Sequence, residues 1–537
     1  MRGRTALCGA LAAMAAGAMV VPAAPLKPSV SAPVAPTAGP TLHVEALQFA
    51  QSLNVLFALI DEYYIRPVPR AELAEAVVRG LYEAVREPMP ADLSHEIRRA
   101  DEYQLIALLT RVREGFGQPE CLRGKKAMLV AMQALPRALD AYCGLVPSRD
   151  QDTRSEGEGN LTGVGLEFPI APPQPNVRGV ILDSQPMVFD ESTAARPNGP
   201  AGPIRVANVV PGGPAQRGGM RPGDLVVKID GLSPEAPAFQ TALKALQHVP
   251  LGTPFQPALA RELRVMVVRD GVAAPLEFRL TPTIYHPESI FGASRRPDGT
   301  WNYLLDPAQR IGYIRVGSIG HQDNVALQAA VKSLQDQACR GLLLDLRWCP
   351  GGYLEESATM ARIFLPPELP IASERSRSEG NKPVTPFGVD ETSTDIPMVV
   401  LVNGETSGGG ELIAAALQDN GRAVVAGQRT FGKGTIQLPL LSRGYPFKLT
   451  KGTFVRPSGK NFQRHPDSKP TDDWGVRPDP DHELPLTAEL SKRLKEWHNL
   501  HALRPPGERG ALPIDDPESD PQRLAAVRML QERVRQK

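Results

Sequence analysis

A basic charge excess, which would point to nucleic acid or to an anionic surface, is missing from this sequence. Its 60 lysines and arginines stand against 59 aspartates and glutamates, so a net charge of +1 is spread over 537 residues. A protein that binds phosphate backbones or acidic lipids needs a clear basic patch or stripe. We therefore predict that the chain has no nucleic-acid partner.

Cysteine is also scarce, with five residues in the whole chain. Cys8 lies near the N-terminus, and the other four are Cys121, Cys143, Cys339 and Cys349. An even number in an exported chain permits disulfides, but four thiols do not make a disulfide scaffold of so long a chain. Their spacing matches no metal site. We predict no metal and no cofactor.

Long hydrophobic runs are absent apart from one short run at the N-terminus. Arg2 and Arg4 precede an apolar run over residues 6–21, and small residues follow it. This order is typical of an export signal, and the run is shorter than the ~20 residues that span a bilayer. We predict that residues 1–24 are removed on export to the periplasm or cell envelope, which leaves no integral membrane span. An uncleaved membrane anchor is the alternative.

Proline, in contrast, is abundant: 54 residues are about twice the usual share of about 5%. At roughly 150 residues per domain, the length predicts three or four domains, joined or decorated by proline-rich segments. We divide the chain into a signal peptide (1–24), a proline-rich linker (25–42), an N-terminal helical region (43–150), a β-rich domain (155–285) with an inserted loop (171–203), an α/β core (286–483) and a helical tail (484–537).

The periodicity of apolar residues supports this division. Helical spacing runs through residues 43–87 and 93–142. Short β-branched runs separated by glycine and proline follow from 163 to 280, which indicates about five strands. From 311 onward, strand-like runs alternate with helical stretches, as in β-α-β crossovers. The predicted fold class is multi-domain α+β, with a helical region, a small β-rich domain and an α/β core.

A motif in the β-rich domain resembles a PDZ domain. It runs from Val210 to Gly231 and contains Gly-Pro-Ala before a short helix, a Pro-Gly-Asp turn and a strand that ends in Asp-Gly. PDZ domains bind the C-terminal tails of proteins, because a glycine-rich loop offers N–H groups to the terminal carboxylate and the tail adds as a strand. The resemblance places the peptide-binding residues of that loop at Gly163, Val164, Gly165 and Leu166.

The α/β region resembles the carboxyl-terminal processing peptidases, also called tail-specific proteases. The matching stretches are 311–314, 341–352, 399–419, 430–437 and 475–479. The resemblance implies a crotonase-like core and a serine endopeptidase that cleaves tails through an acyl-enzyme, with a lysine as the base. It places this base at Lys433 and the glutamine that orients it at Gln437. Burial beside the aromatic Phe431 would lower the pKa of the lysine toward the value that a base needs.

The sequence departs from the family at the nucleophile. The serine of the family stands three residues before the glutamate that opens a helix, and counting back from Glu411 gives Gly408, which has no side chain. The glycines at 408–410 permit unusual backbone angles that would present the neighbouring Ser407. Ser407 is therefore the predicted nucleophile, and the N–H groups of Gly351 and Gly408 are the predicted oxyanion hole.

Two functions of different classes follow from these residues. The first is an exported serine endopeptidase that uses Ser407, Lys433 and Gln437. The second is an inactive member of the family that binds tails through its PDZ domain as a scaffold. In both cases the partners are the C-terminal tails of proteins or peptides. The resemblance also implies a homodimer through the helices at 43–87 and 523–534.

Overall fold

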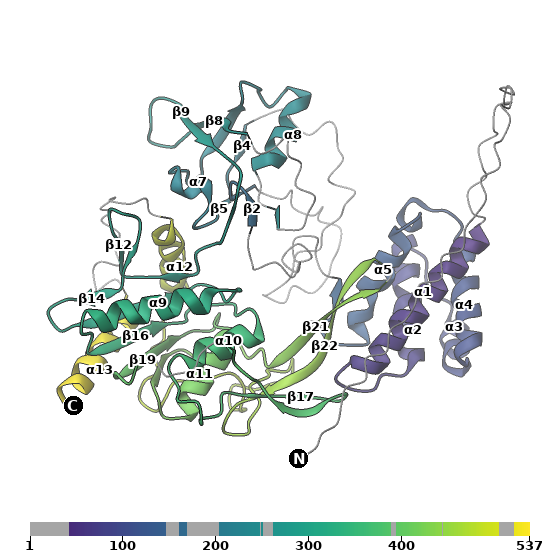
Figure 1. Ribbon diagram of the computed structural model, residues 1–537. Helices are drawn as coiled ribbons and strands as arrows, with labels where there is room; N and C mark the ends of the chain where they lie inside the picture. Colours follow the sequence, from purple (N-terminus) through teal and green to yellow (C-terminus); the bar gives the residue numbers. More distant parts are fainter. Residues whose placement is uncertain are drawn as a thin grey trace, which may run out of the picture.

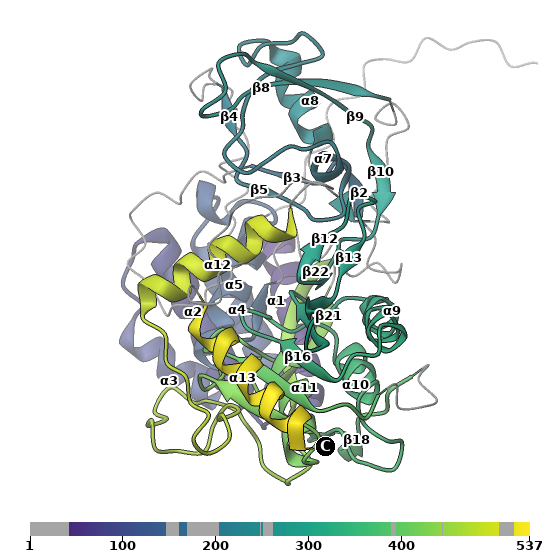
Figure 2. The same cartoon turned by 90° about the vertical axis from the view of Figure 1, so that its left-hand side faces the viewer.

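The computed structural model describes residues 42–145, 161–168, 203–246, 249–250, 261–387, 394–442, 444–503 and 520–536 (Figure 1). The predicted signal peptide, the linker up to residue 41 and the inserted loop up to residue 202 lie outside the described residues. Within the described ranges, no helix is long and apolar enough to cross a membrane. The fold has the three predicted parts: a helical bundle, a β-rich domain and an α/β core (Figures 1 and 2).

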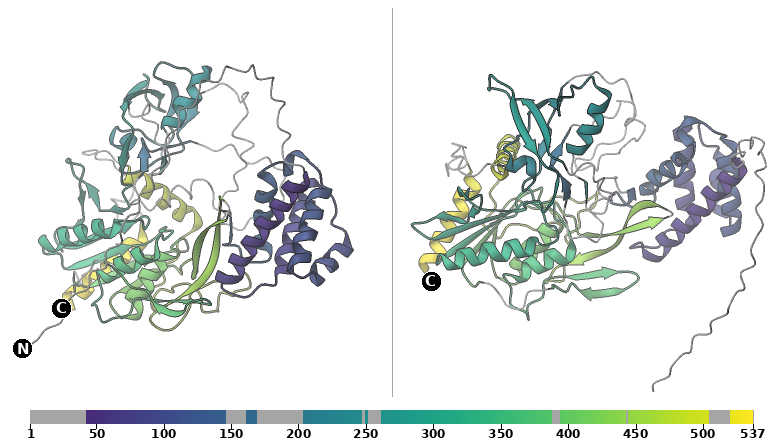
Figure 3. Two further views of the ribbon diagram at one scale, coloured as in Figure 1. Left: turned by 45° about the vertical axis from the view of Figure 1, so that its right-hand side comes forward. Right: turned by 45° about the horizontal axis from the view of Figure 1, so that its top comes forward.

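The N-terminal bundle contains α1 (Leu42–Tyr63), α2 (Arg70–Val85), α3 (Ala91–Arg99), α4 (Glu102–Gly115) and α5 (Lys126–Ala134). Pro67 and Pro69 lie between the first two helices. Asp101 caps α4, because its carboxylate accepts a hydrogen bond from the Gln104 N–H at 2.8 Å. The bundle core also includes Phe447 and Leu449, which belong to a long hairpin of the α/β part. Figure 3 shows the bundle standing at the end of this hairpin.

The hairpin consists of β21 (Thr435–Ser442) and β22 (Tyr445–Val455). It joins a second sheet with β1 (Gly144–Leu145), β17 (Ser373–Ser376) and β18 (Gly380–Pro383). β1 directly follows the helical bundle, so this sheet ties the N-terminal region to the core. The first residues of β21 continue from the loop that carries Lys433.

The β-rich domain is built of short strands around two helices. Its strands are β2 (Leu161–Gly163), β3 (Leu166–Glu167), β4 (Ile204–Arg205), β5 (Asn208–Val209), β6 (Leu225–Ile229), β7 (Val249–Pro250), β8 (Leu263–Val268), β9 (Leu276–Leu280) and β10 (Thr283–Tyr285). The helices are α7 (Pro214–Arg217) and α8 (Pro237–Leu246). One apolar core joins the strands to α8, and it includes Val226 of β6, Val265 of β8 and Phe239 of α8.

The α/β core is built on a six-stranded sheet. Its parallel strands are β15 (Ile311–Val316), β16 (Gly341–Asp345), β19 (Met398–Val402) and β20 (Val424–Gly427), and β11 (Ile290–Phe291) and β14 (Leu304–Asp306) pair with β15. One face packs against α9 (Asp323–Asp336), α10 (Leu354–Arg362) and α11 (Gly409–Asp419), and the other face packs against α13 (Pro521–Gln536). Because both faces are covered, these strands are continuous apolar runs. A small hairpin of β12 (Ser294–Arg295) and β13 (Trp301–Asn302) lies beside the core.

The two C-terminal helices pack against other parts of the same chain. The apolar face of α13 is buried on the sheet through Ala526, Leu530 and Val534, so it is not available as the dimer contact that the sequence suggested. α12 (Ala488–Ala502) lies between the β-rich domain and the core (Figure 2). The residue after it, Leu503, belongs to the core of the β-rich domain, and its carbonyl accepts a hydrogen bond from Gln216 at 3.4 Å. The tail therefore holds these two parts of the chain together.

Candidate active site

Three loops meet at the carboxyl edge of the parallel sheet. Gly351 follows β16, Gly408 follows β19 and Lys433 follows β20. Parallel strands end at one edge, which is where open α/β sheets place their ligands. The approach is close, because a Cβ built on Gly351 would lie 2.5 Å from the Gly409 nitrogen and 2.6 Å from the Ser407 carbonyl oxygen. Only glycine fits at position 351.

Gly408 forms the turn between β19 and α11, with φ 53° and ψ −110°. Glycine adopts such angles readily, whereas other residues pay about 1–3 kcal/mol for them. A strained strand-to-helix turn presents the nucleophile in hydrolases of another fold. A Cβ built at 408 would lie 3.8 Å from the Pro350 carbonyl oxygen and 4.0 Å from Cδ of Lys433. The side-chain position at 408 thus has room for a small group and faces the lysine.

Glu411 fixes this turn from the interior. It is fully buried in the first turn of α11. Its carboxylate accepts hydrogen bonds from the N–H groups of Gly408 at 3.0 Å, Gly432 at 2.7 Å and Lys433 at 2.8 Å. The hydroxyl of Thr430 donates a fourth at 2.5 Å. One side chain therefore ties the turn at 408 to the loop that carries the lysine.

The protonation of Glu411 is expected to make stability depend on pH. Burial raises the pKa of Glu411 from 4.5 to about 7, against the four donors, which lower it. Between these two pH values the folded chain holds a proton that the unfolded chain releases, so the stability from this group falls as the pH rises through the window. We expect the melting temperature of the wild type to decrease from about pH 5 to about pH 8 more steeply than that of Glu411→Gln, which does not ionise. If the plots of melting temperature against pH run parallel for the two proteins, this prediction is contradicted.

The turn offers two hydroxyls, and they differ in their surroundings. Thr406 is fully buried, and its hydroxyl donates to the Leu346 carbonyl at 2.8 Å and accepts from the Asn403 N–H at 3.0 Å. This hydroxyl is part of the scaffold of the turn. Ser407 is half-buried, and its N–H donates to the Cys349 carbonyl at 2.9 Å. Ser407 is therefore the more accessible of the two.

Of the two N–H groups predicted as an oxyanion hole, that of Gly408 has an acceptor within the chain. It donates to Glu411 at 3.0 Å. Cys349, two residues before Gly351, is fully buried. Burial raises the pKa of its thiol to about 12, and the Gly351 N–H acts in the opposite direction. A nucleophile at Ser407 would therefore have one of its two predicted oxyanion donors already engaged.

Lys433 is half-buried and lies beside an aromatic ring. The ring belongs to Tyr142, whose centroid is 5.7 Å from the Lys433 Nζ. Tyr142 follows the N-terminal bundle, so that region reaches the site. The Gln437 amide donates to the Thr450 hydroxyl at 3.1 Å, and this hydroxyl lies 3.1 Å from Asp140 Oδ1. The orienting role of Gln437 toward the lysine stays a prediction.

The residues predicted to bind a peptide form a loop in the β-rich domain. β2 ends at Gly163 and β3 begins at Leu166. The carbonyls of Val164 and Gly165 accept hydrogen bonds of 2.8 Å each from N–H groups in the segment 210–215. Among the described strands, β3 pairs with β5 alone.

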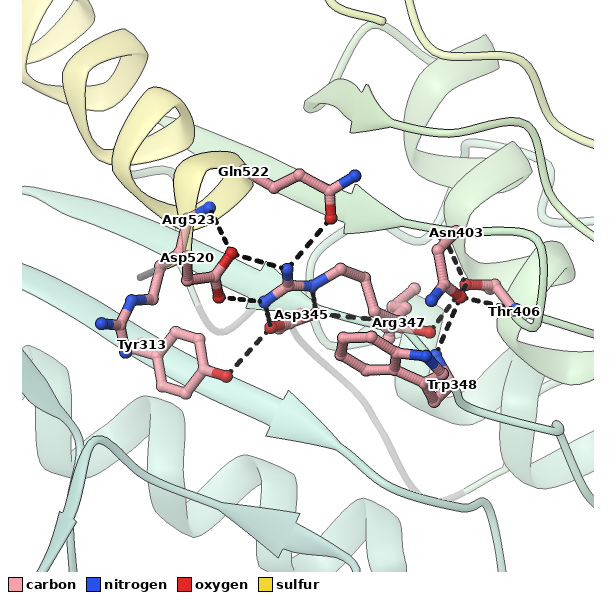
Figure 4. A network of polar contacts seen from close by, with 10 residues as sticks. Tyr313, Asp345, Arg347, Trp348, Asn403, Thr406, Asp520, Gln522 and Arg523 are labelled. Carbon is pink, nitrogen blue, oxygen red and sulfur yellow. Dashed lines mark hydrogen bonds and ion pairs between the residues drawn. The ribbon is translucent and has the colours of Figure 1, made fainter. Parts of the chain in front are cut away.

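A buried ion-pair network supports the loops at the sheet edge (Figure 4). Arg347 is fully buried between Asp345 at 2.7 Å and Asp520 at 2.8 Å. Asp520 precedes α13, so the network ties the C-terminal helix to the end of β16. The next residue, Trp348, donates its N–H to the Asn403 side chain at 3.0 Å. The network therefore runs from the tail to the turn that contains Gly408.

Two regions of the chain match known protein families. Residues 310–481 match the model of peptidase family S41, and residues 205–245 match that of the PDZ domain. The carboxyl-terminal-processing protease of Synechocystis is 31% identical over 276 residues, which are 51% of this chain and 58% of the relative. Over its S41 and PDZ regions the chain is similar to the carboxyl-terminal processing peptidases.

A further relative and a solved structure show how much of the chain is covered by the similarity. The carboxyl-terminal-processing peptidase 2 of Arabidopsis chloroplasts is 30% identical over 70% of this chain and 64% of its own length. The chain thus spans between about half and two-thirds of the length of these curated relatives. Among solved structures, the photosystem II D1 C-terminal processing protease has 21% identity and a TM-score of 0.38, and the match covers 83% of this chain and 94% of that one.

Some residues of this family site were not found from the sequence. In the sequence, Glu411 served only as the residue from which the nucleophile position at 408 was counted. A carboxylate at the start of an apolar helix was nevertheless a signal for a buried charge. Tyr142 and Asp520 gave no local signal, because each reaches its partner from a distant part of the chain. The four cysteines outside the predicted leader are free thiols in the structure.

Proposed function

We propose that this chain is an exported member of the family that captures the C-terminal tails of proteins through its PDZ domain and does not cleave them. The observation that carries the proposal is Gly408. Its backbone has the geometry of a nucleophile turn and its side-chain position faces Lys433, but the residue brings no atom that can attack. Acyl transfer needs such an atom within reach of its base.

The surroundings of the turn support a loss of hydrolysis. The Gly408 N–H, which is the predicted oxyanion donor next to a nucleophile at Ser407, is bonded to Glu411. Loss of one such donor costs about 10²–10³ in rate in a well-studied serine protease. In contrast, the glycine loop and the edge of β3 that no described strand pairs with support tail binding.

A second candidate is a serine endopeptidase that uses Ser407 with Lys433 and Gln437. The observation in its favour is that Ser407 is half-buried, whereas the Thr406 hydroxyl is fully buried. Against it, the Ser407 oxygen would have to reach Lys433 although the backbone of Ser407 is restrained. The restraint is the hydrogen bond from the Ser407 N–H to the Cys349 carbonyl. Nucleophilic attack tolerates little misplacement.

The two candidates differ in a cleavage and binding assay on the mature chain. Fluorescent tail peptides are incubated with the wild type, Ser407→Ala and Lys433→Ala, and both hydrolysis and fluorescence anisotropy are followed. We expect binding by all three proteins and hydrolysis by none. Hydrolysis by the wild type that is lost in both variants would contradict the proposal and establish the endopeptidase. An absence of binding to any tail would contradict both.

A further inference from the structure

Tyr285 lies directly against the glycine loop of the β-rich domain. It is the last residue of β10 and pairs with Leu161 of β2, the strand that leads into the loop. A Cβ built on Gly165 would lie 2.8 Å from the Tyr285 hydroxyl oxygen, and one built on Gly213 would lie 3.2 Å from its ring. Gly165 has φ +83°, an angle that favours glycine. The phenol thus adjoins the space that a side chain at 165 would fill.

The hydroxyl of Tyr285 has no hydrogen-bond partner in the part of the chain that the structure describes. The residue is 6% exposed. Buried hydroxyls are nearly always bonded, so an unpartnered one beside a binding loop points to a partner that arrives with the ligand. Burial and the charge of Glu167 raise the pKa of Tyr285, whereas Arg217 lowers it. At neutral pH the group is therefore an uncharged donor.

We propose that the Tyr285 hydroxyl donates a hydrogen bond to the terminal carboxylate of a tail seated in the glycine loop. The inference rests on the proposed function, in which this loop receives the end of the tail. A carboxylate has about four lone-pair sites that can accept hydrogen bonds. The N–H groups of the loop lie on one side of the carboxylate and need not fill all four, which leaves an acceptor site for the Tyr285 hydroxyl. A bond from a neutral donor to an ionised oxygen is stronger than one between neutral groups. Tyr285 would make the domain prefer a free carboxylate to an amide.

The test uses the full mature chain and a matched pair of probes. The probes are two pools of fluorescein-labelled hexapeptides with the last three positions randomised, one pool ending in free carboxylates and the other in carboxamides. Fluorescence anisotropy gives the dissociation constant of each pool for the wild type and Tyr285→Phe, which keeps the ring and removes only the hydroxyl. Tyr303→Phe is the control, because Tyr303 is a part-buried tyrosine of the core outside the loop.

We expect the wild type and Tyr303→Phe to prefer the free acids equally, and Tyr285→Phe to lose about tenfold of that preference with unchanged amide binding. An undiminished preference in Tyr285→Phe would overturn the assignment. Weaker binding of both pools would also overturn it, because that result indicates a packing role. If the wild type binds neither pool, the proposed function itself fails, and the assignment fails with it.

Discussion

Gly408→Ser is expected to convert the chain into a tail-cleaving peptidase. A Cβ at this position lies 4.0 Å from Cδ of Lys433 and meets no atom closer than 3.8 Å, so a serine fits and faces the base. Removal of a serine nucleophile costs about 10⁶ in kcat in a well-studied protease, so even partial recovery gives a rate at least about 10³ above the wild type. The serine has to adopt φ 53°, which costs about 1–3 kcal/mol of stability. Quenched-fluorescence peptides measure the gain.

Two matched variants isolate the hydroxyl and the base in this experiment. Gly408→Ala introduces the same Cβ and the same backbone strain without an oxygen, and it is expected to be inactive. Gly408→Ser combined with Lys433→Ala keeps the hydroxyl without its base and is expected to lose most of the gained rate. A folded Gly408→Ser protein that binds tails but cleaves none would contradict the placement of the nucleophile at 408. Equal cleavage by Gly408→Ala would show that another residue attacks.

The strands and helices of the core were predictable because their signals are local. The parallel strands β15, β16, β19 and β20 are short apolar runs, as expected where helices cover both faces of a sheet. The PDZ and peptidase motifs then supplied the order of the parts, which the family comparison confirms.

The partners of the tail helices were not predictable from the sequence. An amphipathic pattern shows that one face of a helix is buried but does not identify what covers it. The 523–534 helix was expected at a dimer interface, yet its apolar residues lie on the sheet of their own chain. Leu503 likewise gave no sign that it belongs to the core of the β-rich domain. Such contacts depend on the folded arrangement of the whole chain.

For the candidate site too, some features were predictable from the sequence and others were not. Lys433, Gly351 and Gly408 follow successive parallel strands, so their meeting at one edge was implied once the strands were assigned. The direction of each N–H group was not implied, because it depends on single backbone angles. The bond from Gly408 to Glu411 is a result of this kind. This bond occupies the N–H that was predicted to donate to the oxyanion formed at Ser407.

Asp520→Ala is expected to cause the largest loss of stability of any single change to the tail. Arg347 and both of its carboxylate partners are fully buried, so removal of Asp520 leaves the guanidinium with one carboxylate partner instead of two. Breaking a buried ion pair from one side costs about 3–5 kcal/mol. Burial raises the pKa of Asp520, but the charge of Arg347 outweighs this and holds it below 3.8, so the stabilisation is present at neutral pH and is lost in acid. Urea unfolding followed by tryptophan fluorescence measures the change.

The control for this variant is an ion pair on the surface. Lys332 and Asp336 lie one turn apart on α9 at 3.1 Å, and both side chains are exposed. Lys332→Ala should shift the free energy of unfolding by no more than about 0.5 kcal/mol. Equal shifts in the two variants would contradict a special role for the buried network. Because that network also holds Trp348 beside Asn403, Asp520→Ala should further reduce the cleavage gained by Gly408→Ser, whereas Lys332→Ala should leave it unchanged.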